Sequence, residues 1–193
     1  MFYSKLKSYL FLIFFSVQLF SQPELRQFEH NGVEREYYLY IPDCIENQSP
    51  LVFVFHGYTG SAYGIMEYSN LNEIADSNCF AVCYPQGMID NYGNTFFNVG
   101  YSFHWNESYD DVSFVTTLAE NLQFEYDLSS INTFTTGMSN GGDFSYLLSC
   151  AASTKFRAAA PIAGIMMEWI YDSCSPEIPI PILEIHGTND DVS

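Results

Sequence analysis

Short apolar runs alternate with stretches of helical periodicity along most of this chain, and that alternation limits its fold more than any other feature. Residues 51–55 and 80–84 are almost continuously apolar, as expected of strands that are buried on both faces. Residues 65–76 and 110–122 instead space their apolar side chains three and four positions apart. Strands that alternate with helices predict an α/β fold, with a mostly parallel sheet and helices on both of its faces.

Three more strand-like runs and one helical run continue this pattern, at residues 133–136, 158–162, 180–185 and 140–152. The beginning of the domain differs, because two strand-like runs at 26–30 and 34–41 are joined by Asn31 and Gly32. Asn-Gly between two such runs is a strong signal for a tight β-hairpin. We therefore expect an N-terminal antiparallel hairpin at one edge of the sheet.

The N-terminus has the composition of a secretory signal peptide. Lys5 and Lys7 precede an apolar run at residues 10–15, and polar residues follow it. This run is much shorter than the roughly 20 residues that a helix needs to cross a bilayer, which favours a cleaved signal over a membrane anchor. Residues 1–21 are expected to be removed, leaving residues 22–193 as one exported domain with no stable membrane insertion.

The chain is strongly acidic. Only 15% of its 193 residues are charged, and Asp plus Glu outnumber Lys plus Arg by 23 to 6, which gives a formal net charge of −17. Nucleic acids are excluded as partners, because the neutralisation of phosphates requires clustered Lys and Arg. Anionic membrane surfaces should be repelled for the same reason. The 48% of hydrophobic residues is enough to bury a core, so the chain is not disordered.

Five cysteines remain for a mature, exported chain: Cys44, Cys79, Cys83, Cys150 and Cys174. Export permits disulfides, and the odd number leaves one thiol over or a partner missing. Cys79 and Cys83 flank a strand-like run, where small buried free cysteines are common, and the spacings match no zinc-ribbon pattern. Cys150 with Cys174 is the favoured pair.

A long stretch at residues 86–108 lacks any periodicity and is rich in Asn, Gly, Tyr and Phe. A connection of that length in a small domain is usually functional or disordered. Its aromatic content favours a packed loop that lines a pocket. Packing of the loop against the sheet surface is the alternative.

The most informative motif is Gly-Met-Ser-Asn-Gly at residues 137–141, directly after a strand-like run and directly before a helical one. This is the context of the G-x-S-x-G nucleophile elbow, which holds a serine in a strained turn and exposes its hydroxyl. Ser139 is then the nucleophile, and the backbone N–H of Asn140 faces a developing oxyanion. The alternative is an ordinary glycine-rich turn.

Two further segments supply partners for such a serine. His-Gly-Tyr at residues 56–58 follows a central strand, where the backbone N–H of Tyr58 would be the second oxyanion donor. Residues 186–191 follow the last strand, and Asp190 there fits the acid that orients an imidazole, with Asp191 as the alternative. The competing interpretations are a plain turn with a core histidine and a solvated acidic turn.

These motifs occur together with several others in a fixed order, at residues 56–57, 84–87, 105–106, 110–112, 137–142, 160–164 and 186–190. In this order the chain resembles the secreted esterase family of polyhydroxybutyrate depolymerases and their feruloyl and acetylxylan esterase relatives. The resemblance implies an α/β-hydrolase fold, a nucleophile at Ser139, an acid at Asp190 and no cofactor. It also supports a bridge between Cys150 and Cys174.

One feature of that family has no counterpart here. The family's catalytic histidine follows the acid by some tens of residues, whereas His30, His56, His104 and His186 all precede Asp190. The sequence is therefore expected to be truncated at its C-terminus. His104 lies in the aromatic loop and could approach the serine, but a surface or pocket-lining role is favoured for it.

Two classes of function stay open from the sequence. In the first, the gene product is a secreted serine ester hydrolase that acts on a polyester or on a feruloylated or acetylated polysaccharide through an acyl-enzyme on Ser139. In the second, the chain is complete and is a non-catalytic or inactive hydrolase-like binding protein. A peptidase is a weaker third interpretation, because the same chemistry cleaves amides.

The chain of 193 residues is expected to have little or no esterase activity and to be less stable than a product extended to the next stop codon. A serine hydroxyl without an imidazole is a poor nucleophile, and an uncovered strand at residues 180–185 would be an exposed apolar edge. Turnover and thermal melting of the two proteins, measured side by side, test this. Comparable turnover would show that a base lies within the shorter chain, with His104 the first residue to mutate.

Overall fold

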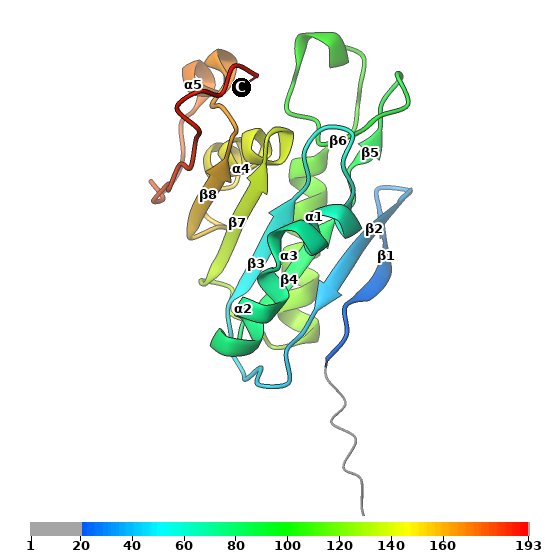
Figure 1. The fold of residues 1–193 in the computed structure, drawn as a ribbon, viewed down its shortest axis with the longest axis vertical. Helices are drawn as coiled ribbons and strands as arrows, with labels where there is room; N and C mark the ends of the chain where they lie inside the picture. Colours follow the sequence, from blue (N-terminus) through cyan, green and yellow to red (C-terminus); the bar gives the residue numbers. More distant parts are fainter. Residues whose placement is uncertain (1–20, 193) are drawn as a thin grey trace, which may run out of the picture.

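The computed structural model describes residues 21–192, so nearly all of the expected signal peptide lies outside the described residues. A six-stranded sheet runs through the molecule in the order β1-β2-β4-β3-β7-β8, with helices on both faces (Figure 1). The strands of this sheet are β1 Glu24–His30, β2 Val33–Tyr40, β3 Leu51–Phe55, β4 Ala81–Pro85, β7 Thr133–Met138 and β8 Ala158–Ile162. The helices are α1 Ala62–Ser69, α2 Leu71–Asn78, α3 Asp111–Glu125, α4 Asn140–Ala151 and α5 Glu168–Ser173.

The sheet confirms the predicted α/β architecture. Strands β4, β3, β7 and β8 are parallel neighbours, whereas β1 and β2 form an antiparallel hairpin whose second strand pairs with β4. The hairpin turn consists of Asn31 and Gly32, with φ angles of 52° and 78°. Two successive positive φ angles match the right-handed twist of the strands, which is why Asn-Gly predicts the hairpin correctly.

Two hydrophobic clusters cover the two faces of the sheet. Phe53 and Phe55 pack with side chains of α3 and α4, while Val54 between them packs on the other face with α1 and α2. Alternate residues of β3 are therefore buried on opposite sides, as the continuous apolar run predicts. Figure 1 shows α1 and α2 in front of the sheet and the paler α3 behind it.

The structure differs from the predicted single helix at residues 65–76. Two helices, α1 and α2, meet there at Asn70, which has a left-handed φ of 52°. The Asn70 N–H donates to the carbonyl of Met66 and caps α1. Asparagine tolerates this conformation and commonly ends helices, so the chain turns where apolar spacing alone predicts continuity.

The segment at residues 180–185 lies along β8 as an irregular edge instead of the predicted strand. It forms isolated parallel bridges, Ala159 with Ile182 and Ile162 with Ile185. Pro181 has no N–H to donate, which limits a regular ladder. Ile182 and Ile185 are 43% and 49% exposed, so this edge is apolar and open to solvent, as the sequence predicts.

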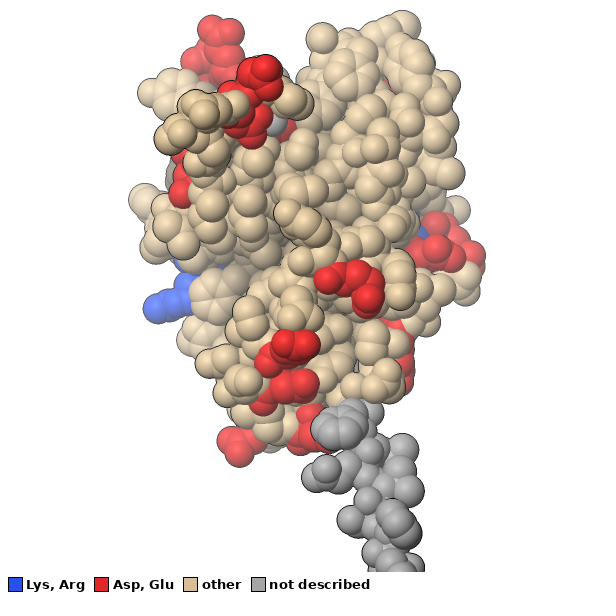
Figure 2. Space-filling model, in the orientation of Figure 1, with Lys and Arg blue, Asp and Glu red and all other residues tan. Residues whose placement is uncertain are grey.

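Acidic side chains outnumber basic ones on the face of the molecule drawn in Figure 2. Figure 2 shows one face on which Asp and Glu side chains are scattered over several elements, with few Lys or Arg side chains among them. Among residues 21–192, no helix has the length and apolar character that a membrane span requires.

Two disulfides within residues 21–192 join the ends of helices to neighbouring loops. Cys150, near the end of α4, is bonded to Cys174 after α5, the pair favoured from the sequence. Cys44 is bonded to Cys79 at the end of α2, so treating Cys79 as a plain hydrophobic residue is wrong. Cys79 has a left-handed φ of 55°, which ends α2 beside the loop that carries Cys44. Cys83 is free and buried in β4, where the apolar run predicts it.

Non-reducing peptide mapping should recover both disulfides and leave Cys83 unmodified until the protein unfolds. Replacing either pair by alanines should lower the free energy of unfolding by about 3 kcal/mol, because each bridge restricts the unfolded chain. Chemical denaturation of the two double variants measures this. Alkylation of all four bonded cysteines in the folded, unreduced protein would contradict the assignment.

Candidate active site

Ser139 occupies a sharp turn between β7 and α4. Its backbone has φ 53° and ψ −122°, a region that non-glycine residues rarely adopt. The strained turn is held on both sides, because the Ser139 N–H donates to the carbonyl of Ile162 at 2.9 Å and its own carbonyl accepts from the Asp143 N–H at 2.9 Å. Tertiary structure thus maintains the geometry that the G-x-S-x-G pattern predicts.

The glycines of the motif allow α4 to approach the sheet closely. A Cβ atom added to Gly137 would lie 2.5 Å from the carbonyl oxygen of Gly141, and one added to Gly141 would lie 2.3 Å from that of Phe55. No side chain fits at either position without moving backbone. The two glycines therefore set the distance between α4, β7 and β3, and with it the position of the serine.

The loop after β3 lies directly against the serine. A Cβ atom added to Gly57 would be 4.0 Å from the Ser139 hydroxyl oxygen. His56 fixes this loop: its Nε2 accepts from the Gly87 N–H at 2.9 Å, so its Nδ1 carries the proton and donates to the Gly57 carbonyl at 2.7 Å. Burial lowers the pKa of His56 and keeps the imidazole neutral, which agrees with this tautomer.

The same hydrogen bond orients the next peptide group. In a trans peptide the C=O and the following N–H point in opposite directions, so holding the Gly57 carbonyl also holds the N–H of Tyr58. Among residues 21–192, no protein acceptor binds that N–H. The N–H of Asn140, the first residue of α4, has no acceptor within its helix either. Both N–H groups belong to the residues at which the sequence predicts oxyanion donors.

The side chain of Asn140 binds the aromatic loop, a contact that the sequence does not predict. Its Oδ1 accepts from the Phe97 N–H at 2.8 Å, and its Nδ2 donates to the Phe97 carbonyl at 3.0 Å. Asn140 is fully buried, so this pair of bonds is shielded from water. It connects the aromatic loop to the residue that follows Ser139.

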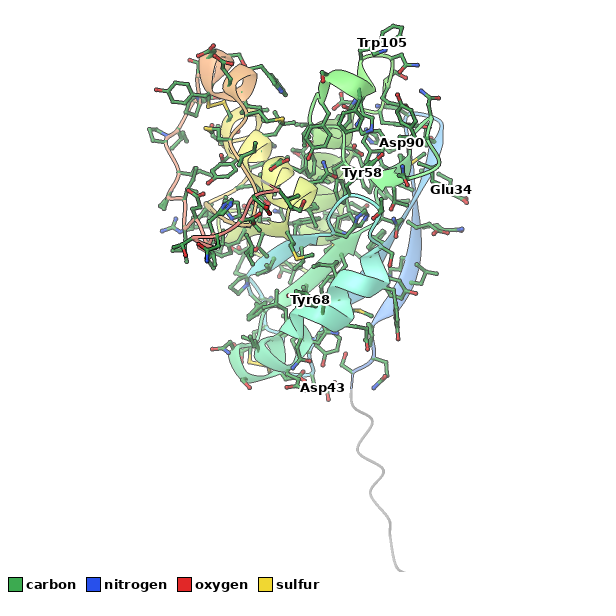
Figure 3. All side chains as sticks on the ribbon, turned by 45° about the horizontal axis from the view of Figure 1, so that its top comes forward. Glu34, Asp43, Tyr58, Tyr68, Asp90 and Trp105 are labelled. Carbon is green, nitrogen blue, oxygen red and sulfur yellow. A yellow bond between two sulfur atoms is a disulfide. The ribbon has the colours of Figure 1, made fainter. Side chains whose placement is uncertain are left out.

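The aromatic loop at residues 86–108 is packed, as predicted, and includes β5 Met88–Ile89, β6 Thr95–Phe96 and the short helix η1 Ser102–His104. The ring of Phe97 stacks on Phe144 of α4 at 5.0 Å. At the tip of the loop, Trp105 is 85% exposed and projects from the top of the molecule in Figure 3. The loop thus combines a buried base with an exposed aromatic tip.

A buried ion pair anchors the end of this loop and was not found from the sequence. Arg35 of β2 donates to Asp111 at 2.6 Å, and the Asn98 N–H donates to the other carboxylate oxygen at 2.7 Å. Burial raises the pKa of Asp111, while the Arg35 charge and these hydrogen bonds oppose that shift. The local pattern does not predict a partner for Asp111, because an acid at a helix start is expected without one.

Asp190 lies in a turn after the edge segment. Its carboxylate accepts from the Val192 N–H at 3.0 Å and lies 3.5 Å from His186 Nε2. The histidines have other partners: His104 is buried and donates to Asp90 at 2.9 Å, contrary to the expected surface or pocket-lining role. Within residues 21–192, no histidine nitrogen is hydrogen-bonded to the Ser139 hydroxyl.

The strand order, the parallel crossovers and the serine turn after a central strand define the α/β-hydrolase fold. Solved structures with this fold include a thermostable esterase, with a TM-score of 0.67 and 22% identity over 88% of this chain and 47% of that one. An acetyl xylan esterase from Aspergillus awamori has a TM-score of 0.60 and 19% identity, covering 74% and 50% of the two chains.

Relatives in sequence point to one class of enzyme. No protein-family model matches the chain. It is 30% identical to feruloyl esterase C of Emericella nidulans over 84% of its length, and 27% identical to a bifunctional acetylxylan esterase/xylanase of Neocallimastix patriciarum over 83%. It spans 58% of the first relative and 22% of the second. These relatives are carboxylic ester hydrolases, in agreement with the resemblance seen in the motifs.

Substitution of Gly141 by alanine should destabilise the fold strongly, because the new methyl group would press on the backbone of β3. We expect the free energy of unfolding to fall by about 3 kcal/mol, the upper range for overpacked sites. Gly187→Ala is the matched control, since its added Cβ would meet nothing closer than 3.9 Å. Equal unfolding curves for the two variants would show that close packing at Gly141 does not hold the turn.

Proposed function

We propose that this chain is part of a secreted serine carboxylic ester hydrolase that forms an acyl-enzyme on Ser139. The observation that carries the proposal is the strained Ser139 turn, with the loop at Gly57 held against it. The esterase relatives support the same reaction class. Export is supported by the N-terminal sequence pattern and by the two disulfides, which form in oxidising compartments.

The proposed reaction begins with attack of the Ser139 oxygen on the ester carbonyl carbon. The carbonyl oxygen becomes an oxyanion, which accepts hydrogen bonds from the N–H groups of Tyr58 and Asn140. A general base takes the serine proton and returns it to the departing alcohol, and water then hydrolyses the acyl-enzyme. Asp190 is the proposed orienting acid. None of the four histidines is assigned as the base, because within residues 21–192 no histidine nitrogen is hydrogen-bonded to the Ser139 hydroxyl.

The proposed substrate is a polyester or a feruloylated or acetylated polysaccharide. The named activities of the relatives favour the polysaccharide esters. The net charge of −17 disfavours strongly anionic polymers. The proposed chemistry needs neither a cofactor nor a nucleic acid partner.

A non-catalytic hydrolase-like binding protein is the second candidate. It is favoured by one observation, that no histidine nitrogen within residues 21–192 is hydrogen-bonded to the Ser139 hydroxyl. The two candidates differ in whether the complete gene product turns over an ester.

Ser139→Ala in the complete gene product should reduce turnover of 4-nitrophenyl acetate, methyl ferulate or a 3-hydroxybutyrate oligomer by at least about 10⁴-fold, because the nucleophile is lost. Labelling by a fluorophosphonate should disappear as well. Ser130→Ala, at an exposed serine, is the matched control and should keep both. Retained labelling of Ser139→Ala would contradict the nucleophile, and an unmutated protein without turnover on any of the three esters would favour the binding protein.

A further inference from the structure

A buried carboxylate lies at the far end of the Tyr58 side chain. Asp90, which follows β5, is 5% exposed and accepts four hydrogen bonds. Its Oδ2 accepts from the Tyr58 hydroxyl at 2.6 Å and from His104 Nε2 at 2.9 Å. Its Oδ1 accepts from the backbone N–H groups of Tyr92 and Asn94, both at 2.8 Å.

These bonds keep Asp90 ionised although it is buried. Burial raises the pKa of Asp90, but the hydrogen bonds from Tyr58, the Asn94 N–H, His104 and the Tyr92 N–H outweigh it and hold the pKa well below the usual range. A carboxylate that accepts several hydrogen bonds is a strong and directional anchor. Asp90 therefore binds the Tyr58 hydroxyl through a charge-assisted bond.

Hydrogen bonds hold the Tyr58 side chain at its hydroxyl group. Its hydroxyl donates to Asp90 and accepts from Asn94 Nδ2 at 2.8 Å, so both functions of the hydroxyl are used. The centroid of its ring lies 5.8 Å from that of His104 and 6.0 Å from that of Phe103. Figure 3 shows Tyr58 and Asp90 side by side below Trp105, which lies at the tip of the aromatic loop.

His104 lies beside Asp90 and helps to shield its carboxylate from water. The side chains of His104 and Asp90 are both completely buried. The imidazole also packs against Phe96 at 4.2 Å and against Phe103 at 4.3 Å between ring centroids. Since a carboxylate accepts, His104 Nε2 carries the proton of their shared bond. Exclusion of water strengthens each of these bonds.

The backbone of Tyr58 is held between two fixed neighbours. On one side, His56 binds the Gly57 carbonyl and thereby orients the Tyr58 N–H. On the other side, Thr59 has a left-handed φ of 66° and donates its N–H to the carbonyl of Thr95 at 2.8 Å. With the side chain anchored at its far end as well, rotation of this peptide group would break several bonds at once.

We propose that Asp90 and His104 are positioning residues of the oxyanion hole, which hold the backbone N–H of Tyr58 toward the carbonyl oxygen of an ester bound at Ser139. This inference rests on the proposed function. Neither side chain reaches solvent, so neither touches the substrate. Their effect should therefore be seen in the stabilisation of the tetrahedral intermediate and not in the binding of the ester.

Tyr58→Phe and Asp90→Asn in the complete gene product test this role. The first removes only the anchored hydroxyl, and the second replaces by an amide a carboxylate that now accepts from four donors. Each should lower kcat on 4-nitrophenyl acetate about tenfold with KM within about twofold, short of the 100- to 1,000-fold loss for an entire oxyanion donor. Tyr68→Phe and Asp43→Asn are matched controls at exposed positions remote from the loop (Figure 3), and they should match the unmutated protein.

Affinity for phenylboronic acid separates positioning from a general loss of structure. The boronate forms a tetrahedral adduct with the serine, so its inhibition constant should rise by the same factor as kcat/KM falls. Thermal melting identifies a variant that fails to fold. Should Asp90→Asn not fold, Tyr58→Phe decides the question alone, because it leaves the carboxylate and His104 in place.

The outcomes distinguish the two proposals. Folded Tyr58→Phe with unchanged kcat and unchanged boronate affinity would overturn the positioning role and leave the esterase intact. An unmutated protein that neither hydrolyses esters nor reacts with a fluorophosphonate would overturn the proposed function, and the positioning role with it. A rise in KM without a change in kcat would also overturn the positioning role, because it would place the effect in substrate binding.

Discussion

The close approach of α4 to the central strands is the constraint on which the candidate site depends. Gly137 and Gly141 leave no space for a side chain against the backbone of Phe55 and of each other. Because the helix begins so close to β3, the chain must turn sharply between β7 and α4. Ser139 lies in that turn in a conformation that only the surrounding packing maintains. The same packing brings the loop at Gly57 beside the serine hydroxyl.

The aromatic loop at residues 86–108 is held mainly by buried polar side chains. Asn140 pairs with the backbone of Phe97, Asp111 receives the Asn98 N–H, and Asp90 receives two N–H groups of the same loop. Each carboxylate or amide satisfies backbone groups that a loop cannot pair by itself. A segment with almost no regular structure can thus have a defined shape beside the turn that carries Ser139.

Sequence pattern predicts the elements of this fold well where the signal is local. The Asn31-Gly32 turn, the apolar run of β3 and the glycine-flanked Ser139 each depend on the conformations that a few neighbouring residues permit. The break between α1 and α2 is missed because Asn70 interrupts an apolar spacing that by itself continues. The bond between Cys44 and Cys79 is missed because spacing does not determine pairing.

The sequence by itself determined the alternating architecture, the acidic surface and the position of the serine turn, because periodicity, charge and turn chemistry are properties of short segments. Only the tertiary structure decided which groups surround that turn. Asp90 and Tyr58 are 32 residues apart, and Arg35 and Asp111 are 76 residues apart. These pairs form because the topology of the sheet brings the residues together and because a buried charge needs a partner. The local sequence around each residue predicts neither pair.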